Sequence, residues 1–155
     1  MKKMILLSII LFLMLISGIT FANLNQSIET QRAKVPFQQS DTLVILWTSG
    51  DPDVALKMIF MYAGTSARVE WWSHVKLIIW GPSSKLTNEN PEIQQGIAKM
   101  QEIGVIVDAC KACADKYEVS DKLSSLGIDV KYMGKTLTEH LKTGKIVLTL
   151  TSRKK

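Results

Sequence analysis

Five short and largely apolar runs, separated by segments with helical spacing, are the feature that most limits what this chain can fold into. The runs lie at residues 42–47, 75–80, 105–109, 128–132 and 146–150. Such runs are typical of strands that are buried on both faces, as in parallel sheets. Parallel strands that alternate with helices are joined by right-handed crossovers. The sequence therefore predicts an α/β domain over residues 41–150, with a five-stranded parallel sheet and helices on both of its faces.

The predicted helices follow from start and stop signals between the strands. The first begins at Pro52, where Asp51 can cap the free amide groups. One side of this helix is expected to carry Val54, Met58, Met61 and Tyr62. Further helices are expected at residues 91–103, in two parts after Cys110 with Ser120 capping the second part, and around Leu137 and Leu141. The segment from Gly81 to Ser84 is interpreted as a turn.

Residues 1–22 have the layout of a secretory signal peptide. Lys2 and Lys3 precede an apolar run over residues 4–19, and Thr20-Phe21-Ala22 ends the run with the small residues of a cleavage site. The run is shorter than the roughly 20 residues of a membrane span. We therefore expect cleavage after Ala22 and a periplasmic or secreted protein that has no membrane contact after cleavage. An uncleaved N-terminal anchor is the alternative.

The segments on either side of the predicted domain are polar. Residues 23–40 are rich in Gln and lack periodicity, so they are interpreted as a flexible leader, and residues 151–155 as a basic tail. The formal net charge of +5 is small and spread along the chain. This charge gives no basis for a nucleic-acid partner.

Cysteine and histidine are too few for the common metal and cofactor sites. The chain contains 2 Cys and 2 His, whereas structural zinc takes about four ligands. Ala114 stands where covalent haem attachment requires a His. Residues 48–51 lack the Gly-Lys-Ser/Thr ending of a phosphate loop. We expect neither a metal nor a cofactor.

Ligand-binding residues are expected where the predicted strands end, because ligands of open α/β sheets bind outside the carboxyl ends of the strands. The turns there hold small residues, which let the backbone approach a ligand closely. The candidates are Ser49, Gly50 and Asp51 in the first turn, Gly81, Pro82 and Ser83 in the second, Lys111 in the third, and Met133 and Gly134 in the fourth. The alternative is that glycine and proline occur there because turns need them.

The third of these turns carries a thiol pair. Cys110 ends a predicted strand and Cys113 lies in the first turn of the next helix, where the helix dipole and Lys111 would lower a thiol pKa. The spacing also allows the two sulfurs to meet as a disulfide. Reactive thiols, a static disulfide that staples the turn, and a thioredoxin-like redox pair all remain open from these residues.

The histidines and the paired tryptophans are weaker candidates. His74 precedes a strand and His140 lies on the last predicted helix, and both are interpreted as surface or packed residues rather than catalytic bases. Trp71-Trp72 lies just before a strand. Exposed aromatic residues there would mark a subunit interface, and core packing is the alternative.

Four blocks of the sequence, at residues 46–58, 77–83, 109–115 and 130–134, resemble the DsrE/DsrF-like (YchN-like) family. The resemblance covers residues 41–150 and implies a DsrEFH-like, flavodoxin- or Rossmann-like three-layer α/β/α sandwich with strand order 4-3-2-1-5. It also implies trimers or hexamers. Some members of this family relay sulfur as a persulfide on a cysteine, and Cys110 matches that position.

The resemblance and the thiol pair together predict a sulfur-relay protein. Cys110 would carry a persulfide, Cys113 would resolve or tune it, and a sulfur donor or acceptor protein would be the partner, beside further copies of this chain. One alternative is a non-enzymatic oligomeric binding module whose cysteines form a structural disulfide. The other is a periplasmic thiol–disulfide oxidoreductase.

Overall fold

The computed structural model describes residues 41–143 and the strand at 146–150, without the side chains of that strand. The predicted signal peptide, leader and basic tail lie outside the described residues. Within these ranges, every helix is too short or too polar to cross a bilayer.

A parallel sheet forms the centre of the domain. Its strands are β1 (Thr42–Trp47), β2 (His74–Ile79), β3 (Ile106–Cys110), β4 (Asp129–Lys131) and β5 (Ile146–Leu150). They lie in the order β4-β3-β2-β1-β5, and each neighbouring pair is parallel. The runs rich in Val, Ile and Leu form these strands because branched side chains pack well on a pleated, buried surface. The prediction of a parallel α/β fold is confirmed.

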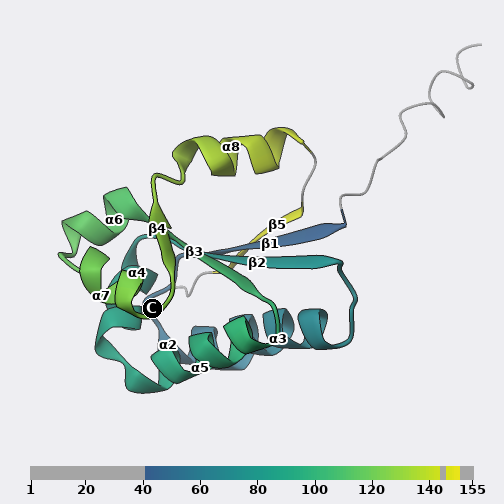
Figure 1. The fold of residues 1–155 in the computed structure, drawn as a ribbon, viewed down its shortest axis with the longest axis horizontal. Helices are drawn as coiled ribbons and strands as arrows, with labels where there is room; N and C mark the ends of the chain where they lie inside the picture. The colour runs from purple at the N-terminus through teal and green to yellow at the C-terminus, as the bar shows by residue number, and fades with distance from the viewer. Residues whose placement is uncertain (1–40, 144–145, 151–155) are drawn as a thin grey trace, which may run out of the picture. The chain divides into compact units, whose positions relative to one another are not determined.

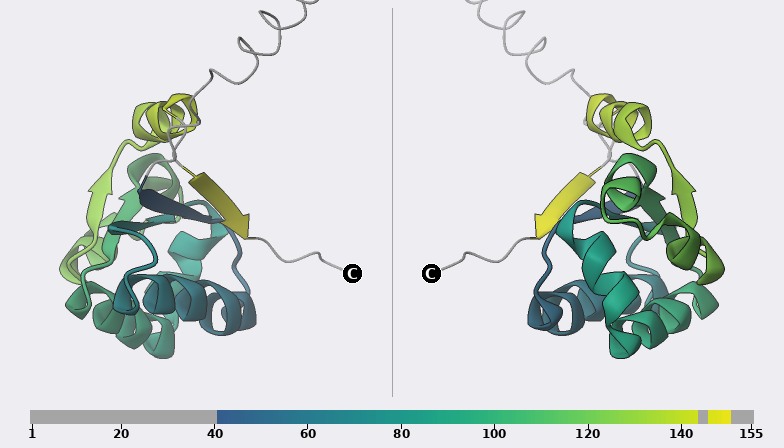
Figure 2. Two further views of the ribbon diagram at one scale, coloured as in Figure 1. Left: turned by 90° about the vertical axis from the view of Figure 1, so that its right-hand side faces the viewer. Right: turned by 90° about the vertical axis from the view of Figure 1, so that its left-hand side faces the viewer.

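Helices lie on both sides of this sheet. One side is covered by α3 (Phe60–Arg68) and α5 (Pro91–Glu102), with α2 (Pro52–Val54) and the π-helix η1 (Ala55–Ile59) preceding α3. The opposite side carries α8 (Gly134–Lys142), as Figures 1 and 2 show. Near β4, the short helices α4 (Pro82–Glu89), α6 (Lys111–Lys116) and α7 (Ser120–Ser125) pack together.

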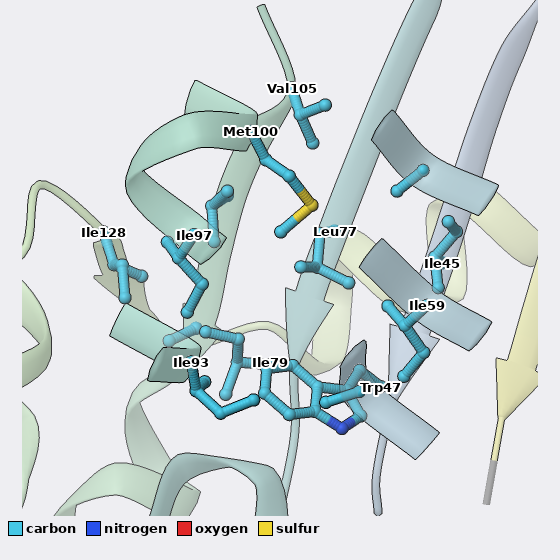
Figure 3. Packing of buried hydrophobic residues seen from close by; sticks show 14 of the residues in the cluster. Ile45, Trp47, Ile59, Leu77, Ile79, Ile93, Ile97, Met100, Val105 and Ile128 are labelled. Atoms are coloured by element: carbon cyan, nitrogen blue, oxygen red, sulfur yellow. The ribbon is translucent and has the colours of Figure 1, made fainter. Parts of the chain in front are cut away.

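The larger core lies between the sheet and the helices α3 and α5. Alternate residues of β1 and β2 point into it, including Trp47, Leu77 and Ile79. Figure 3 shows these side chains interdigitating with the isoleucines of α5 and with Ile59. Full burial of one such side chain stabilises the fold by about 1.5–3 kcal/mol. This face therefore contributes most of the stability that the described residues provide.

A smaller apolar cluster lies on the other face of the sheet. Its buried members are Val44, Ile78, Cys110 and Met133, and the partly buried Leu46, Trp80 and Cys113 pack against it. Successive strand residues point to opposite faces, so Cys110 and the neighbouring Ala109 belong to different clusters. The thiol pair thus lies on the face with the smaller apolar cluster rather than in the main core.

The first helix has a different buried face from the predicted one. Met58 and Met61 are 50% and 63% exposed, whereas Ala55, Ile59 and Ala63 are fully buried. The prediction for the two methionines is wrong, although Val54 and Tyr62 do pack against the core. The segment Ala55–Ile59 is a π-helix, whose wider turn shifts the helical phase by one residue. A period of 3.6 therefore assigns the wrong residues to the core.

Two local predictions around the shorter helices are also wrong. Gly81–Ser84 is the start of α4, with Pro82 at a first helical position that proline suits. Val119, not Ser120, caps α7, and the Ser120 hydroxyl donates to Asp115 instead. The predicted helix around Leu137 and Leu141 is confirmed as α8, on which Leu141 is exposed. In α4 the polar sequence lacks the apolar spacing by which a helix is recognised.

Gly96→Ala tests the packing between α5 and α3. A Cβ at Gly96 would lie 2.5 Å from Cε2 of Phe60, whose ring packs edge-on against Trp47 at 5.7 Å. We expect this substitution to lower the free energy of unfolding by about 1–3 kcal/mol, as overpacking does. The measurement is urea unfolding. Gly134→Ala is the matched control, because its Cβ would meet no atom within 4 Å. Equal stability of both variants would show that the Phe60 ring is not held in place.

Candidate functional site

The thiol pair is assembled by the junction between β3 and α6. Cys110 is both the last residue of β3 and the N-cap of α6, and Cys113 lies in the first turn of that helix. Both cysteines are free. The Cys113 thiol donates a hydrogen bond to Cys110 Sγ, and the two sulfurs are 3.1 Å apart. The spacing of three residues thus brings the two sulfurs into direct contact, as the sequence predicts.

The two thiols differ in their access to solvent. Cys110 is only 3% exposed and packs against Val44, Ile78 and Met133. Cys113 is partly exposed at the rim of the same cluster. Cys110 Sγ is the hydrogen-bond acceptor of the pair.

The backbone of the second turn completes the surroundings of Cys113. The backbone amide of Gly81 acts on the Cys113 thiol and lowers its pKa. Gly81 has a φ of +69°, a conformation that residues with a Cβ adopt only with strain. The predicted ligand residue Gly81 therefore does join the thiol site, and it acts through its backbone.

The pKa of Cys113 is raised, contrary to the expectation of a lowered value at a helix start. Burial is the largest cause, followed by the hydrogen bond to Cys110. The Gly81 amide and the charge of Lys116 act in the opposite direction but do not outweigh these effects. The expectation was wrong because α6 has only 6 residues, so its dipole is weak, while the apolar cluster removes water from the thiol.

Lys111 does not act on the thiols as predicted. Its ammonium group binds both carboxylate oxygens of Asp115, at 2.8 and 2.9 Å, and lies 6.0 Å from the centre of the Tyr132 ring. The hydrogen bonds to Asp115 raise the pKa of Lys111. The cation that influences Cys113 is Lys116 instead. The sequence could not distinguish the two lysines, because both flank Cys113 within one helical turn.

The first turn lies directly against the second. A Cβ on Gly50 would be 3.3 Å from Cβ of Pro82, so only glycine permits this approach without displacement. The Ser49 hydroxyl accepts from the Asp51 amide, and the Asp51 carboxylate accepts from the amide of Asp53 and caps α2. These contacts give Ser49 and Asp51 roles in shaping the turn.

A cavity of about 250 Å³ opens beside the contact between these two turns. The residues that line it are Gly50, Pro82, Lys85, Leu86, Glu89 and Tyr117. It combines the two predicted ligand residues Gly50 and Pro82 with the side chains of α4 and the end of α6. The carboxyl ends of the strands therefore do form a recess, as expected for a parallel sheet.

The remaining predicted ligand residues have structural surroundings. The buried Ser83 hydroxyl accepts from the Trp80 amide and donates to the Trp47 carbonyl oxygen at 2.7 Å, which leaves it no hydrogen for a ligand. Met133 is fully buried against Cys110. Gly134 begins α8, and its carbonyl oxygen accepts from the Thr138 hydroxyl.

The histidines and tryptophans lie apart from the thiol pair along the chain. His74 is exposed at the start of β2, and His140 is buried on α8. Trp72 packs against the core, whereas Trp71 is exposed and lies beside Tyr62 with ring centres 6.4 Å apart. Among the described residues, no group of three or more His, Cys, Asp or Glu side chains is placed to hold a metal ion.

A charged network next to Cys110 was not predicted. Asp108 is 1% exposed on the same face of β3 as Cys110, and it binds Lys76 at 2.8 Å and Lys131 at 3.1 Å. Lys131 is the register partner of Cys110 on β4. Partial burial lowers the pKa of Lys131, but hydrogen bonds to Asp129 and Asp108 outweigh this effect and raise it. The sequence does contain a signal for this network, because lysine and aspartate occur at alternating positions of the predicted neighbouring strands.

Comparison with solved structures finds a conserved protein of unknown function from Bacteroides thetaiotaomicron. The two chains are 39% identical and superpose with a TM-score of 0.70, over 71% of this chain and 95% of that chain. No protein-family model matches the chain, and no curated protein matches it.

The raised pKa of Cys113 predicts how its alkylation depends on pH. Its thiolate forms only above a pKa that lies higher than that of an ordinary thiol, so iodoacetamide should modify it slowly at neutral pH. In Cys110→Ala the hydrogen bond to the neighbouring sulfur is lost, and the pH midpoint should fall. Peptide-level mass spectrometry measures both midpoints. Lys116→Met is the control and should raise the midpoint, and an unchanged midpoint in Cys110→Ala would contradict the coupling.

The charged network predicts a difference between two aspartates that share Lys131. Asp108→Asn removes a buried charge from two lysines and should lower the free energy of unfolding by about 3 kcal/mol. Asp129→Asn removes an exposed partner of Lys131 and should cost less than about 1 kcal/mol. Chemical unfolding measures both. Similar small losses would show that the network does not stabilise β3.

Proposed function

Because the chain belongs to the family of the conserved Bacteroides thetaiotaomicron protein, whose function is unknown, we propose a function from the thiol pair itself. The protein is a sulfur-relay protein that carries sulfur as a persulfide on Cys110. The observation that carries this proposal is the contact of two free thiols at 3.1 Å, with Cys113 as the hydrogen-bond donor and Cys110 as the acceptor.

The hydrogen bond assigns different roles to the two sulfurs. A thiolate, rather than a thiol, attacks a sulfur donor. Cys110 Sγ accepts the hydrogen bond from the Cys113 thiol, and we assign the attack on the donor to this sulfur. Attack by Cys110 on a donor R–S–SH forms the bond to the outer sulfur, and R–SH leaves after taking up a proton. No net oxidation accompanies this transfer.

The surroundings of Cys110 suit a stored persulfide. Val44, Ile78 and Met133 enclose the sulfur on the sheet side, and Cys110 is almost inaccessible to solvent. A persulfide held there is shielded from water and from bulky thiols that would remove its outer sulfur. Export to an oxidising compartment, as the N-terminal sequence predicts, makes such shielding more valuable.

The architecture is consistent with the wider resemblance. We propose that the domain is a three-layer α/β/α sandwich of the DsrE/DsrF-like type, and that it assembles into trimers or hexamers. The strand order β4-β3-β2-β1-β5 supports the first part. Within the described residues, the sheet face that carries α8 in Figures 1 and 2 has the smaller apolar cluster, and this supports the second part, because further copies of the chain could cover that face.

Intact mass spectrometry tests the carrier role. After incubation with disodium disulfide at about pH 6, well below an ordinary thiol pKa, wild-type protein and Cys113→Ser should each gain one sulfur atom. Cys110→Ser should retain little, because it lacks the acceptor sulfur. The circular dichroism of each variant shows whether it is folded.

Two outcomes would contradict this proposal. Absence of the added sulfur from every folded form would support a binding module with a static disulfide. Equal uptake by Cys110→Ser and Cys113→Ser would show that either thiol reacts nonspecifically. In both cases the contact between the two sulfurs would have a structural role and no role in sulfur transfer.

A further inference from the structure

We propose that Cys113 discharges the Cys110 persulfide, releasing hydrogen sulfide and closing a disulfide between the two cysteines, so that the protein reduces sulfane sulfur from small donors. This inference rests on the proposed function, in which Cys110 carries the persulfide. It adds a chemical fate for the sulfur and a class of donor.

The position of Cys113 determines which sulfur of the persulfide it can attack. The inner sulfur of a persulfide on Cys110 is Cys110 Sγ itself, held in place by its Cβ. Cys113 Sγ already lies 3.1 Å from that atom. Formation of an S–S bond of about 2.05 Å needs an approach of only about 1 Å. The contact therefore directs attack to the inner sulfur, with the outer sulfur as the leaving group.

The step is balanced without an external oxidant. The Cys113 thiolate forms a bond to the inner sulfur, and the bond between the inner and outer sulfurs breaks. The outer sulfur leaves with the electron pair as hydrosulfide and takes up a proton to give hydrogen sulfide. The two cysteine sulfurs are oxidised to a disulfide while the sulfane sulfur is reduced to sulfide. A dithiol reductant must then reduce the disulfide before the next cycle.

The backbone around the pair holds this geometry. The Cys113 carbonyl oxygen accepts from the Tyr117 amide at 3.3 Å, which fixes Cys113 within α6. Cys110 is fixed by the register of β3 with β4, where it lies opposite Lys131. A strand end and a helical turn therefore present the two sulfurs to each other with little freedom to separate.

Burial limits the donors that can load the site. Cys110 is 3% exposed, so a persulfide at the surface of a folded partner protein cannot reach its sulfur. The donors we infer are therefore small ones that could pass the partly exposed Cys113, such as inorganic polysulfide and the persulfides of small thiols. The apolar neighbours Val44, Ile78 and Met133 suit a small, polarisable sulfur chain better than a bulky, strongly hydrated group.

Protonation of Cys113 controls the discharge. The thiol must lose its proton before it attacks, and burial together with the contact to Cys110 opposes this loss. The Gly81 amide and Lys116 favour the thiolate once it forms. A loaded persulfide should therefore persist at low pH and be discharged as the pH rises.

Most other charged groups near this helix are already paired. The titratable side chains that act on Cys113 are Cys110 and Lys116. The ion pairs on α6 and on the elements packed against it are Lys111 with Asp115, Lys85 with Glu89, Lys76 with Asp108, and Lys131 with Asp108 and Asp129. Asp121 and Lys122 lie on α7, outside these ion pairs.

A pH-jump experiment tests the discharge. Full-length wild-type protein and Cys113→Ser are loaded with disodium disulfide at about pH 6, desalted to remove the donor, and transferred to higher pH. Wild type should lose the added sulfur, release one equivalent of sulfide and end two hydrogen atoms lighter than the reduced protein. Its release rate should rise about tenfold for each unit of pH below the Cys113 pKa. Cys113→Ser should keep the added sulfur.

The outcomes separate this inference from the proposed function. If wild type and Cys113→Ser load equally and both keep the sulfur at high pH, the discharge is overturned while the carrier role stands. If neither loads, the carrier role fails, and the discharge fails with it. If Cys113→Ser does not fold, the pH series of wild type decides, because a release rate that does not change with pH would overturn a thiolate attack.

Discussion

The parallel pairing of β1, β2 and β3 is the constraint on which the site depends. Parallel neighbouring strands all finish at the same end of the sheet, so the turns that follow them lie close together. Here that convergence places Gly50 against Pro82, and Gly81 against Cys113. The segments that meet are separated by roughly 30 residues of chain, the usual length of a βα unit. The site is therefore a product of topology more than of any single motif.

The two faces of the sheet have different roles, since one provides most of the stability and the other carries the thiol pair. The face toward α3 and α5 buries large aliphatic and aromatic side chains and supplies most of the stability. The opposite face combines a small apolar cluster with a buried aspartate held by two lysines. Reactive cysteines can be placed on this second face because the packing of the main core does not depend on the residues of the smaller cluster. A reactive thiol in the larger cluster would instead have to move inside a closely packed interior.

The sequence predicts the framework well because alternation of apolar runs with turns is a local property that survives in the fold. The meeting of Cys110 and Cys113 follows from the same local logic, since three residues at a helix start bring two side chains together. The buried face of the first helix could not be predicted, because a π-turn changes the period and leaves no mark in composition. The raised pKa of Cys113 could not be predicted from its neighbours in sequence, because the apolar side chains that desolvate it come from other segments of the chain. The Lys76–Asp108–Lys131 network is predictable in principle, because the strand order and the alternation of side chains place these residues on one face of neighbouring strands.

Gly81 contributes to the thiol site without a side chain. Its backbone amide lowers the pKa of the Cys113 thiol, and its positive φ is a conformation that a residue with a Cβ adopts only with strain. The feature that matters at this position is therefore the backbone conformation rather than a side chain. Two relatives could therefore share both cysteines and still differ in reactivity if one of them carried a residue with a Cβ at this position. Sorting members of the family by their cysteines alone would group such proteins together. The glycine that follows the second strand is the better marker of which members hold the second sulfur in the same electrostatic setting.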